Sequence, residues 1–336
     1  MRRLARKLWE GSFALAPFPL VRHLIAQELI APCYHMVSSD PPAHVRHLYP
    51  CPTIDGFEQE LEILLRHFRP ISLSDLHKAV LECDRAPAGY FFLSFDDGFR
   101  ELYDHIAPIC LSKGIPATFF LTTGFLANSS LGFRHKASVL VERCRQLTER
   151  QRRELLRVLC DGHDEQCCEP PEIARWLLSL THAHSDILDR CAALVGVDFA
   201  EYLKIVKPYL THEQVEHLLA QGFTIGAHSV THPAFASLSL DEQSSEVHCS
   251  LAHLHERFVF DINSFALPFT SNGISPEFYR AIFADRSLDL LFSDRVGPGR
   301  DGRVIRRISM ETSGQPLEVL LRNEARVHAR MYFPGG

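Results

Sequence analysis

Two short segments, far apart in the chain, carry the residue types of an open catalytic metal site. One reads FLSFDDG and contains Asp96 and Asp97, and the other reads HSVTHP and contains His228 and His232. Two imidazoles and a carboxylate can hold zinc and leave a coordination position open for water, while a second carboxylate can remove a proton. The two segments together predict metal-assisted hydrolysis.

Both segments follow short apolar runs that are typical of buried strands. Residues 90–95 precede the two carboxylates, and residues 223–227 precede the first histidine. Ligand chemistry in α/β folds collects at the C-terminal ends of parallel strands. Neighbouring side chains of a strand face opposite ways, so the adjacent carboxylates can serve two roles only if the chain turns, which Gly98 permits. One turn between the histidines would project both imidazoles to the same side.

Each segment alone has an ordinary interpretation. Asp-Asp-Gly is common in plain turns, and a chain with 19 histidines contains H-x-x-x-H pairs by chance. The combination of the two segments, each at a strand end and in this order, is a much more specific signal of a catalytic site than either segment alone.

Together the segments resemble the first two motifs of the polysaccharide deacetylases of the NodB-homology type, carbohydrate esterase family four, whose usual forms are T/S-F-D-D-G and H-S/T-x-x-H-P. Residues 33–37 (CYHMV) resemble the opening strand of that family, residues 114–121 (GIPATFFL) its second core strand, and residues 264–269 (SFALPF) its third motif. The resemblance implies an α/β fold, a distorted (β/α)7 barrel.

The resemblance also implies roles for individual residues. Asp96 would be the general base, and Asp97, His228 and His232 would hold one divalent metal ion, with zinc expected. The backbone N–H of Phe269 would help to hold the oxyanion formed when water attacks an acetamido group. The implied substrate is an N-acetylated amino sugar, in a polysaccharide or in its lipid- or nucleotide-linked precursor.

Several positions depart from the family pattern. Ala266 stands where the third motif usually has the arginine that orients the base, so the base is expected to lack that partner, and Thr270 replaces the glycine of an alternative form. The motif built on Asp and Trp has no later counterpart. The L-x-H motif matches only at His253, which we expect on a helix surface, and His328 is expected to be a solvated helical residue. The general acid therefore stays unassigned.

These departures leave two other functions open. One is a catalytically silent barrel that keeps the metal and binds carbohydrate. The other is an amide or imide hydrolase that uses the same site on a non-sugar substrate.

The chain divides into three predicted parts. Its 336 residues, 46% of them hydrophobic, are enough for one large core. Residues 1–30 are predicted to be an N-terminal helical extension and residues 31–336 the barrel, with a helical insertion at about 129–206. Because the insertion follows the C-terminal end of a strand, we expect it to form a lid or one wall of the site. The alternative is that the insertion has no role in the site and only stabilises the barrel or makes a dimer contact.

Local signals place several helix ends. Thr211 with Gln214, and Ser239 with Glu242, have the spacing of capping boxes, and Gly114 suits the residue after a helix end.

Charge and cysteine content restrict the partners and the compartment. The net charge of -6 gives no basic footprint, so no nucleic acid is expected as a partner. Ten scattered cysteines favour reduced thiols in a cytoplasmic protein. The cluster Cys160, His163, Cys167 and Cys168 fits no standard zinc spacing and is predicted to be a loop.

The N-terminus has basic residues before an apolar run, residues 11–21, as a secretory signal does. Pro17 and Pro19 interrupt that run, and no stretch is long enough to cross a membrane. We expect a packed extension, with peripheral contact to an anionic membrane surface as a second interpretation. The oligomeric state is not indicated.

Overall fold

Eight short parallel strands form the centre of the computed structural model, which describes residues 28–160, 170–284, 286–311, 315 and 317–323. The order around the sheet is β10-β1-β4-β5-β6-β7-β8-β9. The strands are β1 (Pro32–Tyr34), β4 (Leu93–Phe95), β5 (Ala117–Leu121), β6 (Thr224–Ala227), β7 (Ser264–Ala266), β8 (Leu290–Ser293), β9 (Val304–Arg306) and β10 (Ile308–Ser309).

A single segment closes this sheet into a barrel, because only Arg307 separates β9 from β10. β9 pairs with β8, where Arg306 lies opposite Ser293, whereas β10 pairs with β1, where Ile308 lies opposite Pro32. The eight strands therefore fill seven positions, since β9 and β10 share one. The predicted distorted (β/α)7 barrel is confirmed.

An aromatic layer fills the barrel interior. The ring centroid of Phe292 lies 4.9 Å from those of both Phe92 and Phe120. Gly226 leaves room for this layer, since a Cβ atom there would lie 2.5 Å from the Phe120 ring. Because strand side chains alternate between faces, Asp96 points to the same interior as Phe92, four residues earlier.

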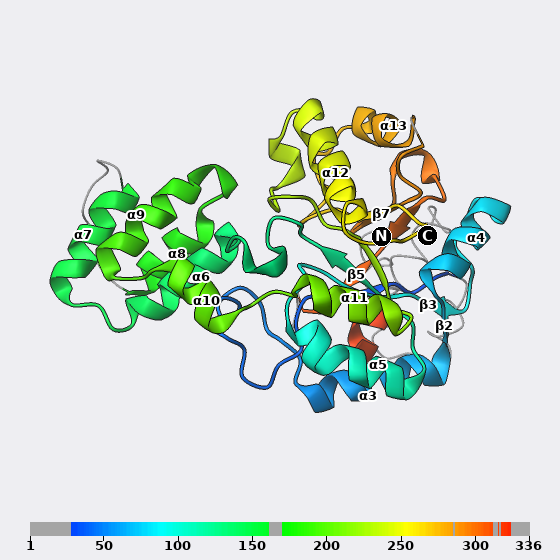
Figure 1. Ribbon diagram of the computed structural model, residues 1–336, viewed down its shortest axis with the longest axis horizontal. Coiled ribbons are helices and arrows are strands. Elements are labelled where there is room, and N and C mark those ends of the chain that lie inside the picture. The colour runs from blue at the N-terminus through cyan, green and yellow to red at the C-terminus, as the bar shows by residue number, and fades with distance from the viewer. Residues whose placement is uncertain (1–27, 161–169, 285, 312–314, 316, 324–336) are drawn as a thin grey trace, which may run out of the picture.

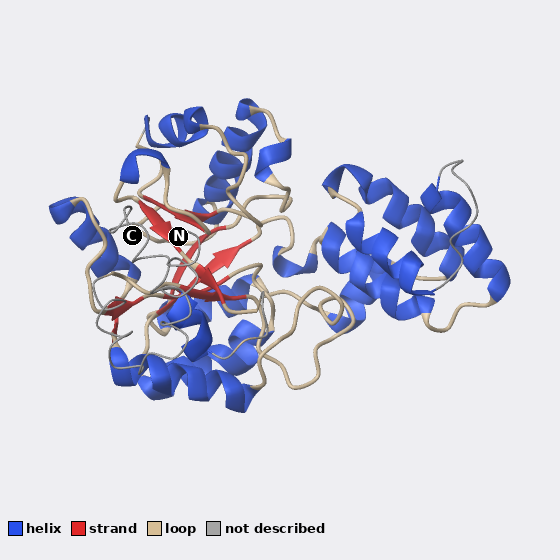
Figure 2. Ribbon diagram, turned by 180° about the vertical axis from the view of Figure 1, so that it is seen from behind, coloured by secondary structure: helices blue, strands red, loops and turns tan. Residues whose placement is uncertain are grey.

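Helices cover the outside of the barrel (Figures 1 and 2) and end where the sequence signals indicate. Both predicted capping boxes form, and Gly114 follows its helix in a left-handed conformation with φ 65°. The covering helices are α3 (Ile54–His67), α4 (Leu73–Cys83), α5 (Ala107–Lys113), α11 (His212–Ala220), α12 (Leu240–His255) and α13 (Pro276–Ala284). Two further short strands, β2 (Arg69–Pro70) and β3 (Tyr90–Phe91), pair with each other in a separate parallel sheet.

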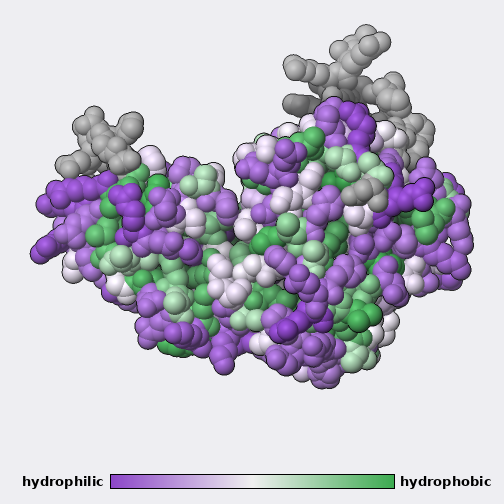
Figure 3. All heavy atoms as spheres, turned by 45° about the horizontal axis from the view of Figure 1, so that its top comes forward, coloured by the Kyte–Doolittle hydropathy of each residue, from purple (hydrophilic) through white to green (hydrophobic). Residues whose placement is uncertain are grey.

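A helical lobe lies beside the barrel, between β5 and β6 in the sequence (Figures 1 and 2). Its helices are α6 (Phe133–Cys144), α7 (Glu149–Cys160), α8 (Pro170–Ser179), α9 (Ser185–Val195) and α10 (Phe199–Val206). The lobe has its own apolar core, which includes Leu140, Leu155 and Leu188. In Figure 3, polar side chains cover much of its outer surface, and a notch separates it from the barrel on one side.

A second apolar cluster joins the lobe to the barrel. Val139 of α6 and Leu203 of α10 pack there with Phe99, Phe125 and Tyr209. The five helices of the lobe, α6 to α10, lie within the predicted insertion. The division of the chain into extension, barrel and insertion stays a prediction. Residues 1–27, most of the predicted extension, lie outside the described residues.

Two further predictions touch the described part of the chain. None of the helices there has the length and apolar character of a membrane-spanning helix. Seven cysteines within the described residues have free thiols, namely Cys33, Cys51, Cys83, Cys110, Cys144, Cys191 and Cys249.

Candidate active site

The adjacent carboxylates diverge because the chain turns directly after β4. Asp96 keeps the strand direction, and its backbone N–H donates to the carbonyl oxygen of Tyr34 at 2.9 Å. Asp97 and Gly98 then take left-handed conformations, with φ of 69° and 79°. This turn directs both carboxylates to one pocket, as the spacing predicts.

The two histidines converge through a tight turn after β6. Ser229 and His232 have positive φ values of 67° and 58°, and the Ser229 hydroxyl accepts a hydrogen bond from the His232 backbone N–H at 2.9 Å. The Nε2 atoms of His228 and His232 lie 3.2 Å apart. Both imidazoles therefore project to the same side, as expected.

Glu246 of α12 holds this turn from outside the pocket. Its Oε2 atom accepts hydrogen bonds from the backbone N–H groups of Val230 at 2.6 Å and Thr231 at 3.1 Å, and its Oε1 atom accepts from the Thr231 hydroxyl at 2.7 Å. The positions of the two histidines thus depend on a carboxylate that no motif includes.

Asp97, His228 and His232 form a buried cluster whose donor atoms lie within 4.8 Å of one another. Asp97 Oδ1 lies 3.2 Å from His232 Nε2 and 3.6 Å from His228 Nε2. That oxygen is buried and has no hydrogen-bond partner within the described part of the chain. Burial raises the pKa of Asp97 to about 7, because the positive charge of His35 offsets the loss of hydration only in part.

The histidines of this cluster have the protonation state of metal ligands. Burial lowers the pKa of His228 to about 4 and that of His232 well below its usual value, so both rings are neutral at pH 7. His228 Nδ1 donates to the Ala266 carbonyl oxygen at 2.8 Å, which leaves the Nε2 lone pair for an ion. The donor set fits a divalent metal ion.

The expectation that Asp96 lacks an arginine partner is wrong. Arg307 Nη1 and Nη2 donate to the two carboxylate oxygens of Asp96 at 2.6 and 2.7 Å. Arg307 lies between β9 and β10, so the strand that closes the barrel supplies the cation that position 266 lacks. Burial alone would raise the pKa of Asp96, but the guanidinium outweighs it and lowers that pKa to about 2.

His35, at the end of β1, is a site residue to which the sequence reasoning gave no role. Its Nδ1 atom is hydrogen bonded to Glu311 Oε2, and Glu311 Oε1 accepts from the backbone N–H groups of His35 at 2.8 Å and Met36 at 2.9 Å. Burial would lower the pKa of His35, but Glu311 raises it to about 9. His35 is therefore protonated at neutral pH and lines the same pocket as Asp96.

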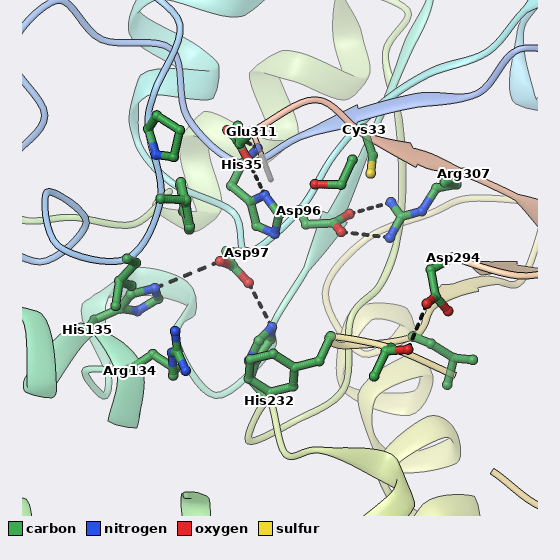
Figure 4. A pocket seen from close by; sticks show the side chains of 17 residues that line it. Cys33, His35, Asp96, Asp97, Arg134, His135, His232, Asp294, Arg307 and Glu311 are labelled. Atoms are coloured by element: carbon green, nitrogen blue, oxygen red, sulfur yellow. Dashed lines mark hydrogen bonds and ion pairs between the residues drawn. The ribbon is translucent and has the colours of Figure 1, made fainter. Parts of the chain in front are cut away.

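The pocket that these residues line has a volume of about 590 Å³, and Figure 4 shows it from close by. Phe269 forms one wall, with its ring 4.7 Å from that of His232 and a positive φ of 59°. Arg134 and His135 of α6 form another. The insertion thus contributes a wall of the pocket, in line with the first of its two predicted roles.

His135 also connects the insertion to the cluster. Its Nε2 atom lies 3.8 Å from Asp97 Oδ2, and its Nδ1 atom is 2.5 Å from the hydroxyl of the buried Tyr209. Burial lowers the pKa of His135 well below its usual value, so this ring is neutral.

His253, which matches the L-x-H motif, does not line the pocket. His253 is exposed on α12, as expected, with Nδ1 3.3 Å from the Thr123 hydroxyl. His328, and His163, Cys167 and Cys168 of the predicted loop, lie outside the described residues.

Comparisons with known proteins establish the fold. No protein-family model matches the chain, and no curated protein matches it. Among solved structures, it is similar to IcaB from Ammonifex degensii, with 16% identity and a TM-score of 0.54 over 89% of this chain and 97% of that one. It is also similar to the Streptococcus pyogenes deacetylase PplD in complex with acetate, with 16% identity and a TM-score of 0.53 over 87% and 96% of the two chains. The predicted resemblance to deacetylases is confirmed at the level of the fold.

Proposed function

We propose that this protein is a metal-dependent hydrolase that removes N-acetyl groups from an amino sugar, in a polysaccharide or in its lipid- or nucleotide-linked precursor. One observation carries the proposal. Asp96, ionised and oriented by Arg307, lies with its Oδ2 atom 3.8 Å from His228 Nε2, beside a buried Asp-His-His cluster in the same pocket. A carboxylate base next to a metal-ligand set is the arrangement that amide hydrolysis by water requires.

Asp97, His228 and His232 would hold the ion, for which we propose zinc. Two neutral imidazoles and one carboxylate are ligands that suit zinc. When bound, such an ion polarises the acyl carbonyl and makes water more acidic.

Asp96 accepts the proton of the attacking water in this proposal. Arg307 occupies one lone pair on each carboxylate oxygen, and the remaining lone pairs can take the proton. The guanidinium also fixes the carboxylate plane, so the base enters the reaction already oriented. The aromatic layer supports it, with Arg307 Cζ 5.2 Å from the Phe120 ring centroid.

His35 donates the proton that the leaving amine needs. An amide nitrogen leaves only after protonation, and His35 carries a proton at neutral pH because Glu311 stabilises the imidazolium. We keep the backbone N–H of Phe269 as the proposed contact to the oxyanion.

The two alternative functions have less support. The case for a silent carbohydrate-binding barrel depended on the absence of an arginine partner for the base and of a general acid. In the proposal, Arg307 is that partner and His35 is that acid. An amide or imide hydrolase acting on a non-sugar substrate would use the same residues, so a substrate panel separates it from a sugar deacetylase.

The test is acetate release. Protein stripped with a chelator and reloaded with one equivalent of zinc is incubated with N-acetylhexosamine substrates and with a cyclic imide, beside Asp96→Asn. We expect release from the sugars that needs zinc and is lost in Asp96→Asn, although that variant still binds zinc. Sugar binding without release would favour the silent barrel, and turnover of the imide alone would favour the third function.

A further inference from the structure

Arg134, the second residue of α6, reaches the active-site pocket from the helical insertion. It lines the pocket with His135, His232 and Phe269. In Figure 4 its side chain lies between those of His135 and His232, and its Cζ atom is 6.0 Å from the Phe269 ring centroid. The proposed mechanism gives this residue no role.

Arg134 differs from the other pocket cations in having no acidic partner. Arg307 is paired with Asp96, and His35 with Glu311. Across the residues that the structure describes, no carboxylate oxygen lies within 4.0 Å of the Arg134 side-chain nitrogens. Partial burial lowers the pKa of Arg134, but an arginine stays charged in proteins. A partly desolvated cation without a partner is costly to the free protein and attracts an anion.

The helix end next to Arg134 adds to this positive potential. α6 has no acidic residue in its first turn, and Gly132, its N-cap, offers no side chain to its free N–H groups. The Gly132 N–H donates to the Tyr209 hydroxyl at 3.2 Å. The N-terminal end of a helix carries partial positive charge, so here it reinforces the guanidinium instead of being neutralised by the chain itself.

The place of Arg134 indicates which part of a substrate it would meet. Asp96 and the Asp-His-His cluster fix where an acetamido group must lie. Arg134 belongs to the insertion wall of the same pocket, whose volume of about 590 Å³ exceeds what an acetamido group alone fills. An arginine fork binds phosphate or carboxylate through two parallel hydrogen bonds.

We propose that Arg134 binds an anionic group, a phosphate or a carboxylate, that the amino-sugar substrate carries beyond its acetamido group. This inference rests on the proposed deacetylase function and narrows its substrates to acidic ones. The insertion thereby determines specificity, and the barrel performs the reaction.

The test compares substrates that differ only in charge. Acetate release is measured from N-acetylglucosamine 1-phosphate, from N-acetylmuramic acid, which carries a carboxylate, and from the neutral methyl glycoside of N-acetylglucosamine. The variants are Arg134→Gln, Arg134→Lys and the matched control Arg150→Gln, which removes an exposed arginine of α7. Thermal melts verify that each variant folds.

In the wild type, we expect an acidic substrate to have a higher kcat/KM than the neutral one. Loss of charge-assisted hydrogen bonds in Arg134→Gln should lower kcat/KM for the acidic substrate, relative to the neutral one, about 10- to 100-fold. Arg134→Lys should retain part of this preference, because lysine keeps the charge but cannot form two parallel hydrogen bonds, and Arg150→Gln should leave the preference unchanged. The acidic substrate for which the preference falls shows whether Arg134 binds phosphate or carboxylate. Equal losses for all three substrates would overturn the inference.

A binding measurement separates this inference from the proposed function. Calorimetry with N-acetylglucosamine 1-phosphate and with N-acetylmuramic acid reports anion binding without turnover. If no substrate releases acetate, the deacetylase proposal fails, while binding that weakens in Arg134→Gln still supports an anion site. Binding that is absent, or that does not change in this variant, overturns the anion site.

Discussion

Arg307 and Asp96 form a buried two-point ion pair between the closing segment of the barrel and the strand that carries the candidate base. The residues are 211 positions apart in sequence, and both side chains are almost inaccessible to water. Removal of one partner from such a pair leaves an uncompensated buried charge.

Replacement of Arg307 by methionine should therefore destabilise the fold as well as the reaction. We expect a loss of about 3–5 kcal/mol in the free energy of unfolding, because the charge of Asp96 stays buried without its partner. The double variant Asp96→Asn/Arg307→Met should recover much of this loss, which urea unfolding of the four proteins measures. Additive losses in this cycle would mean that the two side chains do not stabilise each other.

Replacement of His35 by glutamine should slow amide hydrolysis more than ester hydrolysis. Loss of a general acid costs about 10²- to 10⁴-fold when the leaving group needs a proton. A p-nitrophenyl acetate leaving group needs none, so its turnover should fall much less. Steady-state kinetics on both substrates measure the difference. A similar loss on both would assign His35 to structure instead of proton transfer.

The His35–Glu311 pair should make stability depend on pH. The pKa of His35 is about 9 in the folded protein, above the ordinary value of 6.5. The stabilisation is thus complete below pH 6.5 and is lost as the pH rises through 9. The difference in unfolding free energy between wild type and His35→Gln should shrink over this interval. The same measurement on His105→Gln, which removes an exposed histidine, is the control for a general effect of histidine loss.

Glu246→Gln should weaken metal binding although Glu246 is not a ligand. It would loosen the backbone of the turn between His228 and His232, and groups that orient ligands are worth about 10-fold or more in metal affinity. Competition with a zinc-chelating dye measures the dissociation constant. Glu256→Gln, an exposed change near the end of the same helix, is the control. Equal affinity in wild type and Glu246→Gln would contradict a positioning role.

The parts of the site that local sequence determines were predictable. The turn after β4 and the turn after β6 each lie within one motif. The place of both motifs at strand ends, together with the family resemblance, was enough to group Asp96, Asp97, His228 and His232. The distorted (β/α)7 barrel was expected from the family resemblance. Capping boxes at Thr211 and Ser239 depend on neighbours three residues away, and both form.

Arg307 and Glu311 could not be placed in the same way, because their roles depend on which strands become neighbours. The family resemblance directed attention to position 266, where alanine suggested a missing partner. The interior of a closed barrel can receive an arginine from any strand, and here the last strand supplies it. Two signals were available: arginine in an otherwise apolar run, at Arg306 and Arg307, and a histidine just after an expected strand, at His35.

The split strand at Arg307 has a consequence for the biogenesis of the protein. A ribosome makes both carboxylates and both histidines of the site long before it makes residue 307. A chain that ends before β9 would contain every proposed metal ligand, but it would lack Arg307, the partner of Asp96. The sheet would also stay open between β8 and β1. The proposed hydrolysis should therefore begin only after β9 and β10 have completed the barrel and Arg307 has paired with Asp96.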